Sequence, residues 1–379
     1  MARRPQRRLQ VVHLGGLGEI GKNMMVLRSG GDVLVVDAGL AFPGEDLPGI
    51  DVVIPDMHYL HENRELVRGV VLTHGHEDHV GALPYFLKSF QVPVYGTRLA
   101  LGLVRGKLEE HGLSLPEGSR AVSPGEQVRV GTFNVEFFRV NHSIADAVGL
   151  AIRTPVGLVV HSGDFKFDQT PVNGGVADFH RLAELGDEGV LVLFSDSTNA
   201  ERPGYTPSER LVGERLDQIF RICKGRILVA SFATNVPRIQ QILDASRRHG
   251  RQVAVVGRSV EKVVEVALEL GYLEAPNGLM VGIEEIDRVP PERLTILTTG
   301  SQGEPMSALT RMAMAEHRRV EIVRGDTVII AATPIPGNEK LVHRTVDHLF
   351  RLGAEVIYDA PSGVHVSGHA SQEELKLML

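Results

Sequence analysis

Short runs of apolar residues, separated by glycine-rich turns, fill the first half of the chain in a pattern typical of β-strands. The runs predict strands at Leu9–Leu14, Met24–Arg28, Val33–Asp37, Arg68–Thr73, Gln127–Val130, Val135–Val140, Ala147–Arg153, Leu158–His161 and Val190–Ser195. Apolar residues at helical spacing predict helices at Val80–Phe90 and Leu99–His111. The first half is therefore expected to be rich in β-structure.

The pattern changes after about Ala200, where strands and helices alternate. Strands are predicted at Arg226–Ser231, Gln252–Val256, Leu294–Thr298 and Thr327–Ala331, with helices near 208–222, 236–249, 259–270 and 338–352. Such alternation predicts a parallel sheet covered by helices. The last residues, Gln372–Leu379, have a helical pattern without a C-terminal cap signal, so we expect the sequence to be a fragment.

The composition is that of an ordinary globular protein, with 379 residues, 43% of them hydrophobic, and the length predicts about two domains. A single cysteine, Cys223, excludes an internal disulfide and a cysteine-rich zinc module. The net charge of −7 excludes a protein that binds nucleic acid through a generally basic surface. Binding of a polyanion would therefore require a local basic patch or a bound metal. The arginine-rich start, Met1–Gln10, lacks the apolar stretch of a signal peptide, and no apolar run is long enough for a membrane span. We expect a cytoplasmic protein with no membrane partner.

Gly16, Gly18 and Gly21 follow a predicted strand, and with Asp37 further along they imitate a dinucleotide-binding fingerprint. That fingerprint requires a helix to begin at the last glycine, where the helix N-terminus binds the pyrophosphate. A phosphate-binding loop has the same requirement and also needs a hydroxyl, which Asn23 lacks. Because a strand is predicted to follow, we interpret the segment as a plain turn, unless it closes over another site.

The segment Thr73–His79 contains three histidines directly after a predicted buried strand. Imidazole nitrogen and carboxylate oxygen are ligands that zinc prefers. His74 and His76 are two residues apart, so in extended backbone they point the same way and can bind one ion. Asp78 and His79 follow around the turn and can reach a second ion. The alternative is a histidine-rich polar surface loop, which the position after a buried strand argues against.

Two more candidate ligands follow predicted strands. His142 comes after Val135–Val140, and Asp164 comes after Leu158–His161. Alone, each would be interpreted as a turn or capping residue. Beside the histidine-rich loop they complete a binuclear site, in which Asp164 bridges two cations about 3.5–4 Å apart, as two-metal hydrolysis requires.

The metal-binding candidates are the first part of a resemblance to a known family. The loop His74–His79, together with Asp37, His142 and Asp164, resembles the metallo-β-lactamase superfamily.

The second half of the chain narrows the resemblance. Asp196 resembles motif A, and His369 resembles motif B, of the β-CASP nucleases. The stretches Gly16–Asn23, Thr299–Pro305 and Pro334–Glu339 are similar to the bacterial ribonuclease J family. The similarity runs through essentially the whole chain.

The resemblance implies a mixed α+β and α/β fold and a set of metal ligands. A metallo-β-lactamase αβ/βα sandwich, residues 1–204 and 355–379, would be interrupted by an inserted α/β β-CASP domain, residues 205–354. Two zinc ions would be held by His74, His76 and His142 on one ion, Asp78 and His79 on the other, and Asp164 between them. Asp37 and Asp196 would orient these ligands through hydrogen bonds. Manganese can use similar ligands.

The implied activity is that of a zinc-dependent ribonuclease, both a 5′→3′ exonuclease and an endonuclease. Its substrate would be 5′-monophosphorylated single-stranded RNA, in rRNA processing and mRNA decay. A metal-activated water would attack the phosphorus, and the implied catalytic residues are Asp78, His369 and Asp196. Asp78 is the candidate acceptor of a proton from the attacking water. His369 would donate a proton to the leaving 3′ oxygen or bind the phosphate.

The implied nucleotide-binding turn contains His365, Val366, Ser367, Gly368 and His369. Lys166 and Arg238 are candidate cations of an RNA-binding cleft, and the alternative for each is an ordinary solvated charge. The full-length protein is expected to form a homodimer or a higher homo-oligomer.

Two departures from the family pattern affect this interpretation. The family supplies one more histidine ligand beyond Leu379, and a C-terminal domain, so the second metal is expected to have an incomplete shell. Pro237 stands where a histidine is expected, which removes a possible phosphate donor and stiffens a helix start. Two alternatives stay open, a catalytically silent RNA-binding subunit and a small-molecule hydrolase such as a thioesterase or lactamase. The long α/β insertion argues against the second.

Overall fold

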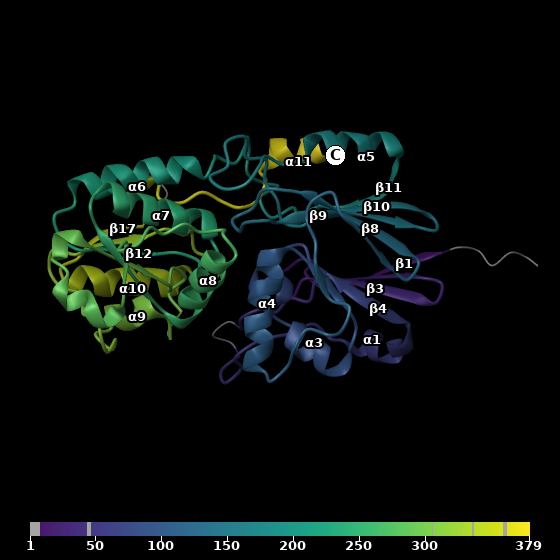
Figure 1. The fold of residues 1–379 in the computed structure, drawn as a ribbon, viewed down its shortest axis with the longest axis horizontal. Coiled ribbons are helices and arrows are strands. Elements are labelled where there is room, and N and C mark those ends of the chain that lie inside the picture. Colours follow the sequence, from purple (N-terminus) through teal and green to yellow (C-terminus); the bar gives the residue numbers. More distant parts are fainter. Residues whose placement is uncertain (1–7, 44–46, 305, 336, 359–361) are drawn as a thin grey trace, which may run out of the picture. The chain divides into compact units, whose positions relative to one another are not determined.

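The computed structural model describes residues 8–43, 47–304, 306–335, 337–358 and 362–379 (Figure 1). Two compact units make up the chain. The first contains Met1–Phe167, Gly175–Tyr205 and Gly368–Leu379, and the second contains Asp168–Gly174 and Thr206–Ser367. Pro305 and Pro336, which belong to two of the family-like stretches, and the start Met1–Arg7 lie outside the described residues.

Two β-sheets pack face to face in the first unit. One has the strand order β1-β2-β3-β4-β5-β6 and the other the order β11-β10-β9-β8-β7. The strands of the first sheet are β1 Leu9–Gly15, β2 Met24–Ser29, β3 Asp32–Val36, β4 Val67–Val71, β5 Val94–Gly96 and β6 Arg120–Ala121. Those of the second are β7 Gln127–Val130, β8 Phe133–Arg139, β9 Val148–Thr154, β10 Gly157–His161 and β11 Val190–Phe194. Alternate apolar positions of both sheets form one buried core, which includes Leu27, Leu34, Phe137, Leu150 and Val159.

Helices cover the outer faces of the two sheets (Figure 1). On the first sheet these are α1 His58–Glu62, α2 Glu77–Val80, α3 Leu83–Ser89 and α4 Arg98–Glu110. Beside the second sheet are α5 Phe179–Glu188 and α11 Gln372–Met378. The helix predicted at Val80–Phe90 is confirmed as α3, which begins three residues later than predicted, at Leu83, and is separate from the short α2, which ends at Val80. The chain turns between them at Gly81 and Ala82, where the Ala82 amide donates to the carbonyl of Ala38.

The second unit is built on a parallel sheet of order β14-β13-β15-β12-β16-β17, as the alternating pattern predicts. Its strands are β12 Ile227–Ala230, β13 Gln252–Val256, β14 Met280–Val281, β15 Leu294–Thr298, β16 Thr327–Ile330 and β17 Glu355–Ile357. Its helices are α6 Arg210–Ile222, α7 Val236–Arg248, α8 Arg258–Glu269, α9 Ala308–Ala313 and α10 Glu339–Arg351. Figure 1 shows α6 and α7 on one face of this sheet and α9 and α10 on the other. In the described part of the chain, no helix is long and apolar enough to cross a membrane.

The carboxyl ends of five strands of the first unit lead into the candidate site residues. Parallel pairing brings the ends of β3 and β4 to one edge of their sheet, and the ends of β10 and β11 to one edge of theirs. β8 runs in the same direction as β10, because each is antiparallel to β9. The residues that follow these strands are Asp37, His74, His142, Asp164 and Asp196. The fold therefore gathers residues that are far apart in the sequence.

A buried carboxylate ties α5 to the second sheet. Glu136 on β8 is 4% exposed and accepts hydrogen bonds from Arg153 on β9 and from two nitrogens of Arg181 on α5. Arg153 also pairs with Glu188 at the end of α5. Burial opposes ionisation of Glu136, but the hydrogen bonds from Arg181 and Arg153 outweigh it and lower the pKa of its carboxyl. The charged form of Glu136 therefore stabilises the folded state.

Replacing Glu136 by Gln is expected to lower the free energy of unfolding at pH 7 by about 2 kcal/mol, because charge-assisted hydrogen bonds are lost. The native pKa of Glu136 lies below its value in the unfolded chain. The stabilisation is therefore complete above pH about 4.3 and declines as pH falls through the native pKa. Urea denaturation of both proteins from pH 7 down to about pH 2.5, well below the pKa of the unfolded chain, measures the difference.

Glu126→Gln is the matched control, because Glu126 forms an exposed ion pair with Arg120 in the same unit and is expected to change stability by at most about 1 kcal/mol. A loss for Glu136→Gln that is the same at every pH would contradict the electrostatic explanation.

Candidate metal centre

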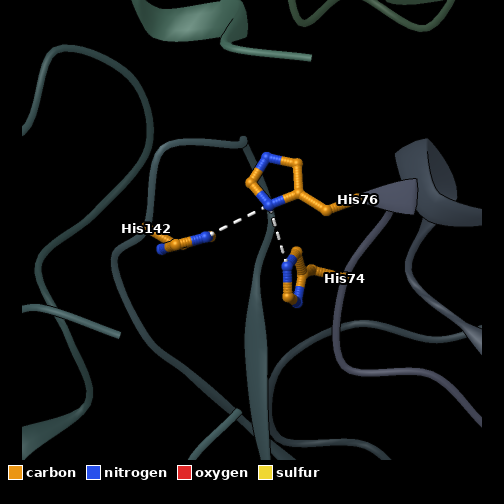
Figure 2. Close-up of side chains that lie close together, drawn as sticks. All are labelled: His74, His76 and His142. Carbon is orange, nitrogen blue, oxygen red and sulfur yellow. Dashed lines mark hydrogen bonds between the residues drawn. The ribbon is translucent and has the colours of Figure 1, made fainter. Parts of the chain in front are cut away.

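Three imidazole nitrogens converge beyond the carboxyl ends of β4 and β8. Nε2 of His74 lies 3.0 Å from Nδ1 of His76, and Nε2 of His142 lies 3.2 Å from the same atom. Figure 2 shows the three rings grouped around this Nδ1 atom. His74 and His142 are buried, and His76 is partly buried. The structure thus brings together the three histidines that the sequence predicts for one metal.

Hydrogen bonds of the ring nitrogens that point away from the centre determine which nitrogens of His74 and His142 carry hydrogen. Nδ1 of His142 donates to the carbonyl oxygen of Gly368 at 2.8 Å, since a carbonyl only accepts. Nδ1 of His74 lies 3.0 Å from the Thr73 hydroxyl, which gives its one hydrogen to Asp37 at 2.8 Å and so accepts from His74. In the neutral rings of His74 and His142, Nε2 therefore presents a lone pair to the centre.

This arrangement fits a cation. Two lone pairs face Nδ1 of His76, which can carry one hydrogen at most, so the three nitrogens cannot all be satisfied by one another. A zinc ion accepts such lone pairs, and hydrogen bonds from the far nitrogens of the rings are typical of zinc-binding histidines. The ligand atoms of His74, His76 and His142 all lie within 4.8 Å of one another.

A second group of ligand atoms surrounds His79, the last residue of the histidine-rich loop. Its Nδ1 lies 2.8 Å from Oδ2 of Asp37, which leaves Nε2 to face two other carboxylates. That Nε2 lies 3.3 Å from Oδ2 of Asp164 and 3.7 Å from Oδ2 of Asp78. Nδ2 of Asn23 lies 3.1 Å from it as well.

One oxygen of Asp164 faces both groups. Besides its contact with His79, Oδ2 of Asp164 lies 3.7 Å from Nε2 of His142 and 3.9 Å from Nε2 of His74. The ligand atoms of His74, His79 and Asp164 form a second compact set, and those of His142, Asp164 and His369 form a third. Asp164 thus has the placement that a bridging carboxylate requires.

Burial and neighbouring charges separate the pKa values of these groups. Burial, followed by the neighbouring imidazoles, holds the pKa of His74 and of His76 well below the ordinary value, and burial lowers that of His142 to about 4. Burial also opposes a charge on His79, but Asp164, Asp78 and Asp37 outweigh it and raise its pKa well above the ordinary value. His74, His76 and His142 are thus neutral at neutral pH, as metal ligation requires.

Asp37 holds the histidine-rich loop rather than facing the centre of the site. Its Oδ1 accepts from the Thr73 amide at 2.8 Å, and its Oδ2 contacts both the Thr73 hydroxyl and His79. Asp37 has a φ of 60°, a left-handed conformation that costs free energy in a residue other than glycine. The following Gly39 lets the backbone approach closely, because a Cβ there would lie 1.6 Å from the Asp78 carbonyl oxygen.

His369 and Asp196 form a hydrogen-bonded pair beside the cluster. Nδ1 of His369 lies 2.8 Å from Oδ2 of Asp196, whose other oxygen accepts from the Thr198 amide and hydroxyl. Burial lowers the pKa of His369, but the hydrogen bond to Asp196 and the charge of Asp164 raise it to about 9. The rings of His369 and His142 are 4.9 Å apart between centroids.

The structure also places the residues predicted for the nucleotide-binding turn and the two candidate cations of an RNA-binding cleft. Gly368, predicted for the nucleotide-binding turn, contacts His142 through its carbonyl, whereas His365, Val366 and Ser367 belong to the second unit. The two candidate cleft cations are wrong, because Lys166 is 2% exposed and Arg238 is fully buried.

The glycine-rich turn before β2 is not a nucleotide-binding motif, since β2 follows it directly. It does close over another site. Asn23, which sequence reasoning missed, donates through Nδ2 to the carbonyl oxygen of Asp78 at 3.1 Å and lies 3.4 Å from its Oδ2. The only sequence signal was a polar residue at the end of a glycine-rich turn.

Comparison with known proteins identifies the family. The metallo-beta-lactamase superfamily model matches residues 17–185, and the model of the ribonuclease J beta-CASP domain matches residues 224–349. Ribonuclease J2 of Bacillus subtilis is 46% identical over 379 residues, which are 100% of this chain and 68% of that protein. The chain belongs to the ribonuclease J family.

Two other members of the family have somewhat higher sequence identity to this chain. Ribonuclease J of Synechocystis is 52% identical over 98% of this chain, and ribonuclease J of Thermus thermophilus is 49% identical over 99% of it. The chain spans only 58% and 66% of the lengths of these two relatives. A crystal structure of a protein of unknown function from Enterococcus faecalis has a TM-score of 0.67 over 98% of this chain and 91% of that one, at 15% identity, and shows the same fold. The predicted fold class, a metallo-β-lactamase domain with a β-CASP domain, is confirmed; the boundaries at residues 204/205 and 354/355 stay a prediction.

Replacing Asp37 by Asn is expected to weaken zinc binding about 10–100-fold, because one carboxylate oxygen becomes an NH₂ group. At the Oδ2 position this removes the acceptor of both the Thr73 hydroxyl and His79, and at the Oδ1 position it removes the acceptor of the Thr73 amide. Titration of zinc into metal-free protein measures the affinity. Asp32→Asn is the control, since Asp32 is the first residue of β3, the strand that Asp37 follows, and it pairs with Arg68. Equal zinc affinity in wild type and Asp37→Asn would contradict the assigned role.

Proposed function

We propose that the chain is the catalytic part of a zinc-dependent ribonuclease that hydrolyses phosphodiester bonds of RNA. The observation that carries the proposal is the convergence of ring nitrogens of His74, His76 and His142, two of which present lone pairs, next to the carboxylates of Asp164 and Asp78. Membership in the ribonuclease J family supports RNA as the substrate. Manganese can replace zinc with these ligands.

The site would hold two ions, one on His74, His76 and His142 and the other on Asp78 and His79, with Asp164 between them. Bound zinc acidifies water and stabilises negative charge on a phosphate. Complete loading of the second position would need a ligand from the part of the family fold beyond this chain.

The side chains around the ions would move protons and hold RNA. Asp78 would accept a proton from the attacking water. His369 would donate a proton from Nε2 to the leaving 3′ oxygen from its doubly protonated form, which Asp196 stabilises through the hydrogen bond to Nδ1. Nucleotides next to the cleaved phosphodiester bond would be bound by the turn that contains His365, Val366, Ser367, Gly368 and His369.

The substrate would be single-stranded RNA with a 5′-monophosphate, cleaved by 5′→3′ exonuclease and endonuclease action in rRNA processing and mRNA decay. The full-length protein would act in the cytoplasm as a homodimer or higher homo-oligomer. Pro237, the second residue of α7, has no backbone N–H group, so that position cannot donate to a phosphate through its backbone.

The decisive experiment measures zinc content, RNA binding and cleavage of a 5′-monophosphorylated RNA by the full-length protein. Zinc binding, RNA binding and metal-dependent cleavage are expected together. Absence of cleavage despite two bound zinc ions and bound RNA would contradict the proposal and favour a silent RNA-binding subunit. Hydrolysis of thioesters or lactams without cleavage of RNA would favour a small-molecule hydrolase.

Within this experiment, Asp196→Asn is expected to lower kcat by about 10²–10⁴-fold with zinc content unchanged, because Asp196 contacts His369 and not the histidines of the first metal set. Asp187→Asn is the control, since Asp187 is an exposed residue of α5. Loss of zinc from Asp196→Asn would assign this carboxylate to metal binding instead.

A further inference from the structure

Arg238 of the second unit is a fully buried arginine whose hydrogen-bond donors are all used. It lies in the first turn of α7, where its amide donates to the side chain of Asn235. Its guanidinium makes five contacts. Nε and Nη2 donate to the two carboxylate oxygens of Glu209 at 2.8 and 2.7 Å. Nη1 donates to the Ala331 carbonyl at 2.6 Å and to Nδ1 of His365 at 2.9 Å, and Nη2 also donates to the Val366 carbonyl at 3.4 Å. A guanidinium has five N–H groups, so each contact takes one.

The neighbours of Arg238 neutralise its charge and hold it in place. Glu209 is 7% exposed and also accepts from Gln241 at 3.2 Å. The Glu209 amide donates to Oδ2 of Asp168 at 3.0 Å. An arginine enclosed in this way has no donor left for a phosphate, so it acts on RNA only through the residues that it contacts.

The contact with His365 determines the tautomer of that ring. A guanidinium can only donate, so Nδ1 of His365 must accept and cannot carry a hydrogen. The hydrogen of the neutral ring is therefore on Nε2. A second proton would place an N–H group at Nδ1 against an N–H group of Arg238, next to a positive charge.

We propose that Arg238 is a positioning residue that fixes His365 as the neutral Nε2–H tautomer. The ring then meets RNA as a hydrogen-bond donor to a phosphate oxygen, and it is neither a proton acceptor nor a metal ligand. The same guanidinium holds the carbonyl of Val366, so it fixes two neighbouring residues of the nucleotide-binding turn. This inference rests on the proposed function, which gives that turn its role in RNA binding.

The tautomer is tested directly by nitrogen NMR of this chain labelled with ¹⁵N-histidine, with the His365 signals assigned by their loss in His365→Gln. At neutral pH we expect a non-protonated Nδ1 and a protonated Nε2. In Arg238→Lys this single state is expected to be lost, because an ammonium group cannot reproduce the five fixed donors. A protonated Nδ1 of His365 in the wild type would overturn the proposal.

Arg251→Lys is the matched control for the loss of a buried guanidinium. Arg251 is 3% exposed in the same unit and donates to the carbonyls of Gly225, Leu294 and Cys223, away from His365. Its replacement is expected to leave the His365 signals unchanged. A change of these signals in Arg251→Lys as large as in Arg238→Lys would show a general loss of structure and overturn the specific role of Arg238.

The consequence for RNA is tested by steady-state cleavage with the full-length protein. Arg238→Lys is expected to raise KM about tenfold, the value of one charge-assisted hydrogen bond, with kcat little changed. His365→Gln, which can still donate and accept, is expected to recover part of this loss relative to His365→Ala. Unchanged KM in Arg238→Lys and in His365→Ala, with active wild type, would overturn this inference and leave the proposed function standing. An inactive wild type would refute the proposed function, and with it the RNA contact inferred here, while NMR would still decide the tautomer.

Discussion

The site depends on one constraint, the convergence of imidazole lone pairs in a buried space. His74 and His142 are forced to direct Nε2 lone pairs inward, because the Thr73 hydroxyl and the Gly368 carbonyl accept the hydrogens of their other nitrogens. His76 Nδ1 can carry only one hydrogen and so satisfies at most one of these two lone pairs, whereas a cation accepts both. The hydrogen bonds of Nδ1 of His74 and of His142 therefore determine which ring atoms are available to a metal, in addition to the identity of the residues themselves.

The two-sheet architecture supplies this constraint. Strand ends from both sheets bring the histidine-rich loop, His142 and Asp164 to one place, although they come from separate parts of the sequence. Asp37 holds the histidine-rich loop in place, since it contacts both Thr73 and His79. Its own backbone adopts a strained conformation. In the second unit, Arg238 plays a similar part for His365, again by occupying one ring nitrogen so that the other is defined.

The sequence predicts the parts of this site that depend on local pattern. Spacing indicates that His74 and His76 share a ligand set, and the apolar runs place His142 and Asp164 after strands. Long-range contacts escape such reasoning: nothing in the sequence shows that Asn23 reaches Asp78 and His79, or that Arg238 is buried rather than exposed in a cleft. The start of α3 at Leu83 rather than Val80 was missed for the same reason, because the turn at Ala82 depends on a hydrogen bond to Ala38, far away in the sequence.

The central claim is that the converging nitrogens are a metal site. Anomalous X-ray scattering at the zinc absorption edge, from crystals of the protein loaded with zinc, tests this claim most directly. The account predicts a zinc peak within bonding distance of His74 Nε2, His76 Nδ1 and His142 Nε2, with Asp164 beside it. Zinc peaks elsewhere on the chain, with these three nitrogens bound only to one another or to water, would contradict it.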